Sequence, residues 1–526
     1  MLKIPLPFVL TNHEKKWDYY KIALVLLLLI QIWASYSFVA KDKSIWGEDA
    51  SAYYNISIRY YHELCHANYK TPLNLYRIDP FRHSIFMYLT IPIYWIFGVE
   101  RSSALYTNFA VLIILIFSIY GIGKSLKDSR VGLLSATIVM LFPGTFCLSR
   151  MYLLDFALTA MVSLSVYLLI KSDCFRNNFF SYLFGLSCGI GMLVKIPFVI
   201  FIIVPFIYMV HISLKRDTRN QQITCKKNIA KSSLLWILIP MVWYVPAIHV
   251  VVKRIVNAAV LFGLHREGPY LKNLFLYLSA YRLTSLLFAA LFIYSIFRLI
   301  RSKMKNKTFL ILWTVFPLLF LSLSPTKSIR YALPVLPSVS IIISAGILSI
   351  ETKWWRRTLI AVAVFLGVLQ YYLITYKSSL INEKFFHLFN AKSWDDRFYS
   401  KPIDTRDWHL MNIINCLKEH YDPKHATPTI NICVFSMDDY VWNLISESYR
   451  LNLPFSIQSA GYVPLKSLDV DFVLVQDGGF IADSVEDYLK RVNESKKIFE
   501  KNIDKFKLIE TFQLPNKAKL SLYQKI

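Results

Sequence analysis

Two adjacent acidic residues, Glu48 and Asp49, follow closely on the first long apolar run of the chain, which covers 22–40. They lie in the stretch Ser44–Asn55, and an aromatic-rich helical pattern follows them. A carboxylate of this kind is able to take a proton from a hydroxyl group and so to act as a general base. Acidic residues beside an apolar run are also commonly just solvated, so the other polar residues of the chain decide between the two interpretations.

A third acidic residue, Asp155, begins a later apolar run at 155–171 and follows shortly after Arg150. Such a residue often marks only the interfacial end of a membrane helix. Two carboxylates at helix ends on the same side of a membrane can instead converge on one polar ligand, and Asp155 would then orient an acceptor or the base. We therefore take Asp155, Glu48 and Asp49 together as candidate catalytic residues.

Three basic residues, Lys195, Lys327 and Arg330, stand at the ends of apolar runs. Lys195 separates two such runs with almost no loop, and a lysine inside a membrane span is costly unless it snorkels or pairs. Arginine offers a planar fork for phosphate, and lysine offers a point charge. We expect these three cations to bind the phosphate of a lipid-linked donor. Snorkelling to anionic lipid headgroups is the alternative.

The segment His62-Glu-Leu-Cys-His66 matches H-E-x-x-H, in which two histidines one helical turn apart bind zinc and the glutamate is the general base. A membrane zinc protease is therefore an alternative function. No third ligand is identifiable by spacing, and His83 is a weak candidate for it. We favour a solvated helix face for this segment, and no metal site or cofactor is assigned, although a divalent metal stays open.

The composition places the chain in a membrane. It is 55% hydrophobic and only 18% charged, whereas soluble proteins carry about 25% charged residues. Many apolar runs approach or reach the ~20 residues that cross a bilayer. The net charge of +25 would suggest nucleic acid in a soluble protein, but here the basic residues cluster in short loops between apolar runs. We expect a polytopic α-helical membrane protein that contacts lipids and no nucleic acid.

Charge in the loops predicts the topology. The stretch Ser84–Gly98 is short and contains Pro92, so it is interpreted as an interfacial helix. If it does not cross, the basic loops after the second, sixth, eighth and tenth spans share the cytoplasmic side with the N-terminus, as the positive-inside bias requires. The eleven predicted spans are 22–40, 103–121, 131–147, 155–171, 179–194, 196–213, 231–249, 272–298, 308–323, 331–350 and 357–376.

The same parity places all the candidate site residues outside the cytoplasm, together with a loop at 250–271 and the C-terminal part of the chain. We expect a transmembrane catalytic domain at 1–376, whose first external loop is 41–102, and an extracytoplasmic α/β domain at 377–526. In that domain the pattern predicts strands at 429–435, 471–475, 507–514 and 520–524, and helices at 437–450 and 483–501. It contains no nucleotide-binding motif, and Cys416 and Cys433 are candidates for a disulfide.

The membrane part resembles the GT-C superfamily of integral membrane glycosyltransferases, especially the bacterial aminoarabinose lipid A transferases and the protein O-mannosyltransferase-like enzymes. The resemblance covers about 17–350 and depends on the order of several segments. These are the acidic pair after the first span, Arg150…Asp155, Gly191-Met-Leu-Val-Lys-Ile-Pro197, Trp243-Tyr-Val-Pro246 and Thr326-Lys-Ser-Ile-Arg-Tyr-Ala-Leu-Pro-Val-Leu-Pro337.

This resemblance implies a polyprenyl-phosphate sugar donor, transfer on the non-cytoplasmic side of a bacterial-type inner membrane, and an acid of the first external loop as base. The family usually shows Asp-Glu where this chain has Glu48-Asp49, and the spacing to Tyr53 aligns Asp49 with the first acid of the family. Which of the two acids is catalytic stays open. The candidate substrate-binding residues are Tyr53, Tyr54, Arg82 and Tyr331. For the three tyrosines an aromatic belt at the membrane interface is the alternative.

The reaction that we expect is transfer of one sugar to an envelope acceptor, which is a lipid, a glycan or a protein, with inversion at the anomeric carbon. A sugar phosphate carries its own leaving group, so one base suffices and the cations stabilise the departing phosphate. A transporter or flippase of lipid-linked glycans is the alternative from another functional class. It would need the cations but no base.

Overall fold

The computed structural model describes residues 19–80, 84–215, 219–264, 281–302, 304, 306–323, 328–376, 402–420, 430–436, 438–460, 470–478 and 486–526. The predicted site residues Arg82 and Lys327, and also His83, lie outside these described residues. The chain divides into two compact units. The first comprises Met1–Ser37, Asp79–Leu89 and Leu105–Pro402, and the second comprises Phe38–Ile78, Thr90–Ala104 and Ile403–Ile526.

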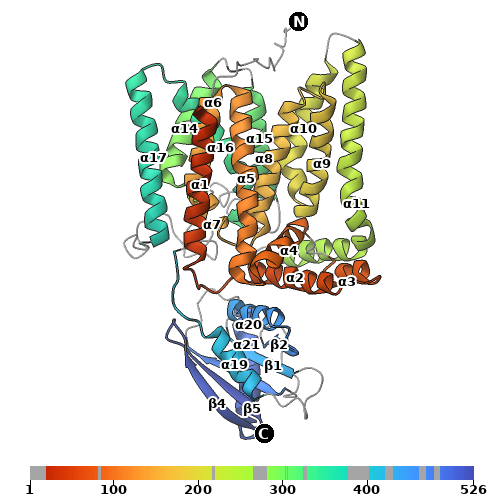
Figure 1. The fold of residues 1–526 in the computed structure, drawn as a ribbon, viewed down its shortest axis with the longest axis vertical. Coiled ribbons are helices and arrows are strands. Elements are labelled where there is room, and N and C mark those ends of the chain that lie inside the picture. Colours follow the sequence, from red (N-terminus) through yellow and green to blue (C-terminus); the bar gives the residue numbers. More distant parts are fainter. Residues whose placement is uncertain are drawn as a thin grey trace. The chain divides into compact units, whose positions relative to one another are not determined.

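The first unit consists of apolar helices, and its long helices run side by side (Figure 1). Among the described residues, six helices are long and apolar enough to cross a membrane and five more are shorter but apolar. The helices are α1 (Tyr19–Val39), α4 (Ile85–Phe97), α5 (Arg101–Leu126), α6 (Ser129–Leu141), α7 (Pro143–Leu148), α8 (Leu154–Lys171), α9 (Asn178–Val194), α10 (Phe198–Leu214), α11 (Arg219–Leu264), α13 (Tyr281–Thr284), α14 (Leu286–Arg301), α15 (Lys307–Leu323), η1 (Ile329–Val335), α16 (Leu336–Leu348) and α17 (Lys353–Tyr376).

Each of the eleven predicted spans overlaps at least one of these helices, and the predicted short helix at Ser84–Gly98 corresponds to α4. The division into units falls within α1, α4 and α5. The chain is a polytopic α-helical membrane protein with a small C-terminal α/β domain, so the predicted fold class is confirmed. An apolar run of this length favours a helix in a bilayer, because every peptide group must be hydrogen-bonded there and a helix makes those bonds within one segment.

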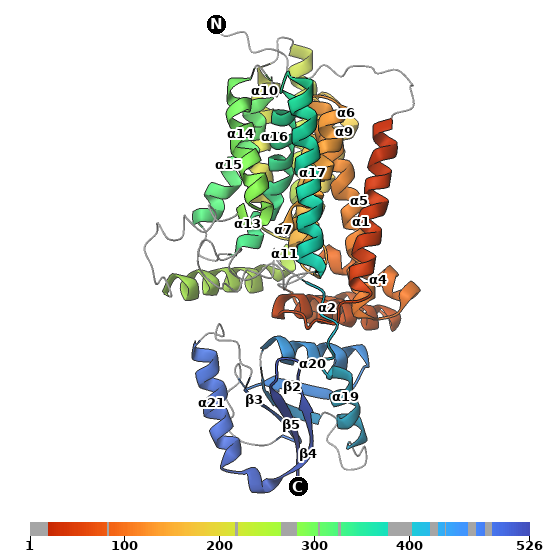
Figure 2. The same ribbon diagram turned by 90° about the vertical axis from the view of Figure 1, so that its left-hand side faces the viewer.

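Two predicted boundaries were wrong. The predicted span 131–147 is interrupted at Phe142, because Pro143 at the first position of α7 forces the preceding residue into an extended conformation. The predicted loop at 250–271 is helical as far as Leu264, since α11 continues for 46 residues. Its two stretches run in different directions in Figures 1 and 2, and Pro240 and Pro246 supply the breaks in backbone hydrogen bonding that allow a helix to bend.

Burial distinguishes central helices from peripheral ones within the first unit. In the apolar stretch of α8, 83% of the residues are buried, and in that of η1–α16, 89% are buried. In the apolar stretches of α11 and α17, only 17% and 22% of the residues are buried, which is typical of helices that face lipid. The candidate residues Asp155 on α8 and Arg330 on η1 therefore come from the interior of the unit.

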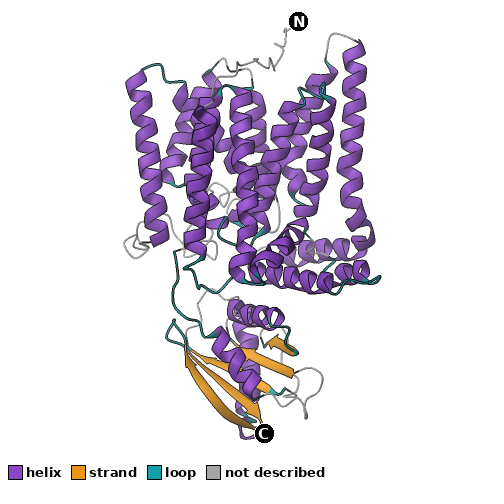
Figure 3. Ribbon diagram, viewed as in Figure 1, coloured by secondary structure: helices purple, strands orange, loops and turns teal. Residues whose placement is uncertain are grey.

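The second unit contains α2 (Glu48–Cys65), α3 (Thr71–Ile78) and the α/β domain, where the strands are found (Figure 3). Five strands form one sheet in the order β2-β1-β3-β5-β4, in which β1 is parallel to β2 and β3 while β5 is antiparallel to β3 and β4. The elements are α19 (Leu410–Glu419), β1 (Ile430–Phe435), α20 (Asp438–Arg450), β2 (Phe455–Ser459), β3 (Phe472–Asp477), α21 (Glu486–Glu500), η4 (Ile503–Lys505), β4 (Phe506–Gln513) and β5 (Lys519–Lys525).

The sheet has a separate hydrophobic core on each face. Ile432 and Val434 of β1 pack with residues of α19 and α20, whereas Cys433 and Phe435 pack with residues of α21. Figure 2 shows α19 and α21 on opposite sides of the sheet. This alternation follows from the period of two residues in a strand. It also separates Cys433 from Cys416, which belongs to the core on the α19 side, and both thiols are free. The suggested disulfide between them is therefore not formed.

Candidate functional site

Asp155 is the second residue of α8, whose N-cap residue Leu153 is extended. An acidic residue is favourable there because the amides at the start of a helix carry partial positive charge. The residue is almost fully buried, and the hydroxyl of Thr159 donates a hydrogen bond of 2.8 Å to the Asp155 backbone carbonyl oxygen. A carboxylate buried to this extent needs a cationic partner, because burying an uncompensated charge is costly.

Lys195 supplies the first partner. It ends α9 in an extended conformation, and its backbone N–H donates to the Gly191 carbonyl oxygen at 3.2 Å. A side chain at position 191 would not fit, since a Cβ there would lie 2.3 Å from the ring of Phe198. The chain therefore reverses tightly between α9 and α10, and the Lys195 Nζ atom reaches Asp155 Oδ1 at 2.7 Å.

Arg330 and Tyr331 complete this group from the 3-10 helix η1. The Nε atom of Arg330 lies 3.7 Å from Asp155 Oδ2. The ring of Tyr331 is 4.8 Å from Lys195 Nζ and 5.5 Å from Arg330 Cζ, which places both cations within range of a cation–π interaction. The structure thus brings together four predicted site residues, which we call the Asp155 cluster: Asp155, Lys195, Arg330 and Tyr331.

The burial of the Asp155 cluster is graded. The Asp155 side chain is 2% exposed, whereas the side chains of Lys195 and Arg330 are 18% and 10% exposed. The two cations are therefore more accessible than the carboxylate between them. Their charges and that of Asp155 sum to +1, so an incoming anion would meet net positive charge in a largely buried setting, where electrostatic attraction is strong.

Two residues that we did not predict as site residues hold the segment before Asp155. Asn108 of α5 donates hydrogen bonds of 2.9 and 3.0 Å to the carbonyl oxygens of Ser149 and Met151. Arg150 is fully buried and donates to Thr375 at 2.9 Å and to the hydroxyl of Tyr371. An arginine between apolar segments is visible in the sequence and could have marked Arg150 as a residue that needs partners. Those partners, on α17, lie more than two hundred residues away along the chain.

The last carbonyls of α9 are also occupied. Ser84 Oγ donates to the Val194 carbonyl oxygen at 3.0 Å, and the hydroxyl of Tyr244 donates to the Met192 carbonyl oxygen at 2.9 Å. The final carbonyls of a helix have no partner inside the helix, so such donors fix its end. Lys195 consequently projects from a well-defined position.

The predicted acids Glu48 and Asp49 form the first turn of α2 in the second unit. Both are partly exposed, and so is Tyr53. Tyr54 is fully buried against Trp46, with ring centroids 5.4 Å apart, and burial raises the pKa of its hydroxyl well above the ordinary value. Tyr54 thus contributes to packing, and its predicted contact with substrate stays a prediction, as do the roles of the other site residues.

The H-E-x-x-H segment lies at the end of α2. The ring of His62 contacts the Tyr449 carbonyl oxygen at 3.2 Å, and that of His66 contacts the His62 carbonyl oxygen at 3.0 Å. Glu63 accepts a hydrogen bond of 2.8 Å from the side chain of Asn74. Within the described part of the chain, no group of three or more His, Cys, Asp and Glu residues is arranged to hold a metal ion.

Comparisons with known proteins add to this geometry. The family model for dolichyl-phosphate-mannose-protein mannosyltransferase matches residues 86–255, which include Asp155 and Lys195. The whole fold resembles ArnT from Cupriavidus metallidurans bound to undecaprenyl phosphate, with a TM-score of 0.59 and 11% identity over 96% of this chain and 98% of ArnT. This chain has the GT-C glycosyltransferase fold. The predicted resemblance is therefore confirmed at the level of the fold.

Two other solved GT-C structures are similar. AglB of Archaeoglobus fulgidus, in complex with an inhibitory peptide and a dolichol-phosphate, has a TM-score of 0.50 and 12% identity, over 87% of this chain and 69% of AglB. The arabinofuranosyltransferase AftD from Mycobacteria has a TM-score of 0.54 and 9% identity, over 98% of this chain and 40% of AftD. No curated protein matches this chain by sequence.

Proposed function

We propose that this protein is an inverting glycosyltransferase that moves one sugar from a polyprenyl-phosphate donor to an envelope acceptor. The observation that carries the proposal is the Asp155 cluster, in which two cations with net positive charge lie at the ends of central helices of a GT-C fold. Ionisable groups inside membrane bundles are costly to maintain and commonly mark substrate sites.

The donor class follows from the charge and from the structural neighbours. Lys195 and Arg330 present an ammonium and a guanidinium to an anion, the combination suited to a phosphate. ArnT was solved with undecaprenyl phosphate and AglB with a dolichol-phosphate, both of which are polyprenyl phosphates. In this proposal Asp155 holds the two cations apart and oriented, Lys327 adds a third positive charge, and Tyr331 and Arg82 contact the donor.

The proposed reaction is a single displacement. Asp49, or Glu48 beside it, removes the proton from an acceptor hydroxyl as that oxygen attacks the anomeric carbon. The bond between this carbon and the phosphate oxygen breaks, and its electron pair leaves on the polyprenyl phosphate, whose charge Lys195 and Arg330 stabilise. Attack from the side opposite the leaving group inverts the configuration. Tyr53 would line the sugar side of the site.

The location is part of the proposal. The positive-inside bias of the loops assigns the N-terminus to the cytoplasm and the C-terminal domain to the other side of a bacterial-type inner membrane. Externally added maleimide tests this with cysteines placed at Leu126 and Thr326 in a variant that lacks the native cysteines. Labelling at Thr326 alone would support the orientation, and labelling at Leu126 alone would overturn it.

The function itself is tested in a deletion strain. Mass spectrometry of envelope glycans and lipids should show the loss of one sugar, which returns with the wild-type gene and not with the double variant Glu48→Gln, Asp49→Asn. If that variant retained full sugar transfer as a purified protein, the base mechanism would be wrong. If proteoliposomes moved the donor between leaflets without transferring its sugar, the protein would be a transporter.

A further inference from the structure

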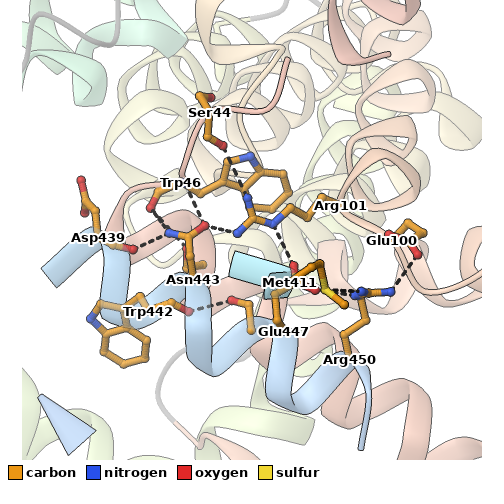
Figure 4. Close-up of polar contacts among 12 residues, drawn as sticks. Ser44, Trp46, Glu100, Arg101, Met411, Asp439, Trp442, Asn443, Glu447 and Arg450 are labelled. Carbon is orange, nitrogen blue, oxygen red and sulfur yellow. Dashed lines mark hydrogen bonds and ion pairs between the residues drawn. The ribbon is translucent and has the colours of Figure 1, made fainter. Parts of the chain in front are cut away.

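Helix α20 presents three polar side chains on one side. Asp439, Asn443 and Glu447 are spaced four residues apart, so they lie above one another along the helix. Figure 4 shows Asn443 directed at Trp46 and Arg101, and Glu447 directed at Arg101, which opens α5. All of these residues belong to the second compact unit. A polar row of this kind on a half-buried helix indicates a specific docking contact.

Asn443 binds the backbone just before α2. Its Oδ1 atom accepts a hydrogen bond of 3.0 Å from the Trp46 N–H, and its Nδ2 atom donates one of 2.7 Å to the Trp46 carbonyl oxygen. The side-chain amide thus pairs with both backbone groups of one residue, as a neighbouring strand would. Asn443 is fully buried, so its replacement by alanine would remove two buried hydrogen bonds to the backbone of Trp46.

Asp439 binds the first amide of α2 itself. Its Oδ1 atom accepts a hydrogen bond of 2.9 Å from the Glu48 N–H. The residue at the N-cap position of α2 is Gly47, which has no side chain to cap the helix. The first amides of a helix have no partner within it, and α20 supplies an acceptor for the first amide of α2.

Arg101 and Glu447 hold the same contact from the side. The Arg101 guanidinium donates to Asn443 Oδ1 and lies 5.4 Å from the Trp46 ring centroid, and its Nε atom is 3.3 Å from Glu447 Oε1. Glu447 also accepts from Arg450 Nε at 2.6 Å, and Arg450 continues to Glu100 at 2.8 Å. The row on α20 is thus embedded in a network of charged side chains, which restricts its movement.

We infer that α20 positions the candidate base, with Asp439 and Asn443 as positioning residues that fix the direction in which Glu48 and Asp49 project. The inference rests on the proposed function for the role of those two acids, and it gives the C-terminal domain a task in the reaction. Small displacements of a reacting group reduce rates strongly, by about a hundredfold for ~1 Å. The side chains of Asp439 and Asn443 act through the backbone of Trp46–Glu48 and do not touch the substrate.

The test compares variants of the purified full-length protein in a sugar-transfer assay that uses the native lipid extract as donor. Asp439→Ala and Asn443→Ala should each lower kcat at least tenfold while the donor KM changes less than twofold. Asp439→Asn keeps an oxygen that can accept the hydrogen bond and should recover most of the wild-type kcat. Lys496→Ala, on α21 of the same domain, is the matched control and should leave kcat unchanged.

Hydrogen exchange supplies a readout that does not need activity. The Glu48 amide should exchange faster in Asp439→Ala, and the Trp46 amide should exchange faster in Asn443→Ala. Faster exchange with unchanged kcat would overturn the positioning role and leave the transferase intact. Equal loss of kcat in Asp439→Asn and Asp439→Ala would also overturn it. If the wild-type protein transfers no sugar, the proposed function fails. If the Glu48 and Trp46 amides exchange at unchanged rates in the alanine variants, the contact of α20 with this segment does not hold it, whatever the function.

Discussion

The ammonium of Lys195 donates a hydrogen bond to Asp155 across 2.7 Å, and the two residues end and begin different helices of the central bundle. Lys195→Ala should therefore reduce two quantities. Binding of undecaprenyl phosphate should weaken at least tenfold, because a cation of the site is lost. The free energy of unfolding should fall by about 3–5 kcal/mol, because Asp155 loses a buried partner. Isothermal titration calorimetry in detergent and chemical unfolding measure the two effects.

The double variant Asp155→Asn, Lys195→Met separates these causes. It removes both charges, so most of the stability should return while binding of the lipid phosphate stays weak. Lys231→Met, at an exposed position of α11, is the control and should leave both quantities unchanged. Lipid affinity at the wild-type level in Lys195→Ala would remove this residue from the phosphate site.

The packing of α9 against α11 depends on two glycines four residues apart. A Cβ at Gly185 would lie 2.4 Å from the Ser232 carbonyl oxygen, and one at Gly189 would lie 2.7 Å from Ile239 Cβ. Small residues at this spacing let membrane helices approach closely. Gly185→Ala should destabilise the protein by about 1–3 kcal/mol and displace the helix that carries Lys195.

A thermal unfolding assay in detergent checks the effect of Gly185→Ala. Leu186→Ala changes the neighbouring residue, whose side chain is 40% exposed, and should have a much smaller effect. A Gly185→Ala protein as stable as the wild type would mean that the two helices separate without cost.

Glu447 is the acidic centre of the network in the second unit, between Arg101 and Arg450. Burial alone would lower the pKa of the Arg450 guanidinium, but the charge of Glu447 raises it above its ordinary value. Glu447→Gln should lower the unfolding free energy by about 1.5–3 kcal/mol, the range for hydrogen bonds to charged groups. Limited proteolysis of the C-terminal domain provides the measurement.

Asp477→Asn is the comparison for Glu447→Gln. Asp477 pairs with Lys496, but its side chain is 61% exposed, and such pairs contribute only about 0–1 kcal/mol. Equal protease sensitivity of the two variants would show that the network around Glu447 adds no stability.

The cysteines should differ in reactivity. Cys65 is exposed, whereas Cys433 is buried and its pKa is raised from 9.0 to about 12 by that burial. Because the thiolate is the reactive form, iodoacetamide at neutral pH should label Cys65 in the native protein and Cys433 only after unfolding. Peptide mass spectrometry measures both sites, and rapid labelling of Cys433 in native protein would contradict its burial.

The raised pKa of Cys433 also has a consequence for stability. The folded state keeps a proton that the unfolded state releases above pH 9.0, so this thiol's contribution is complete below that pH and is lost as the pH rises toward about 12. In Cys433→Ala the free energy of unfolding, measured by denaturant titration, should fall less between pH 9 and pH 11 than in the wild type. An equal fall in unfolding free energy for wild type and variant would contradict this.

Much of the fold followed from the sequence because its signals are local. Each predicted span overlaps at least one helix, and the parallel strands β1 and β3 coincide with the two apolar runs of the C-terminal domain. The strand β2 was missed, because Phe455–Ser459 is short and only its two end residues are buried. The continuation of α11 beyond residue 250 was missed because the predicted apolar span was ended at residue 249.

The sequence by itself determined which residues could do chemistry, because charged side chains at the ends of apolar runs are visible without a structure. Only the tertiary structure decided their partners. Asp155 meets Lys195 and Arg330, and the amide of Glu48 meets Asp439, which is 391 residues away. A helix or a strand is specified by its own period, whereas an ion pair or a cap supplied from another helix exists only when packing brings two distant segments together.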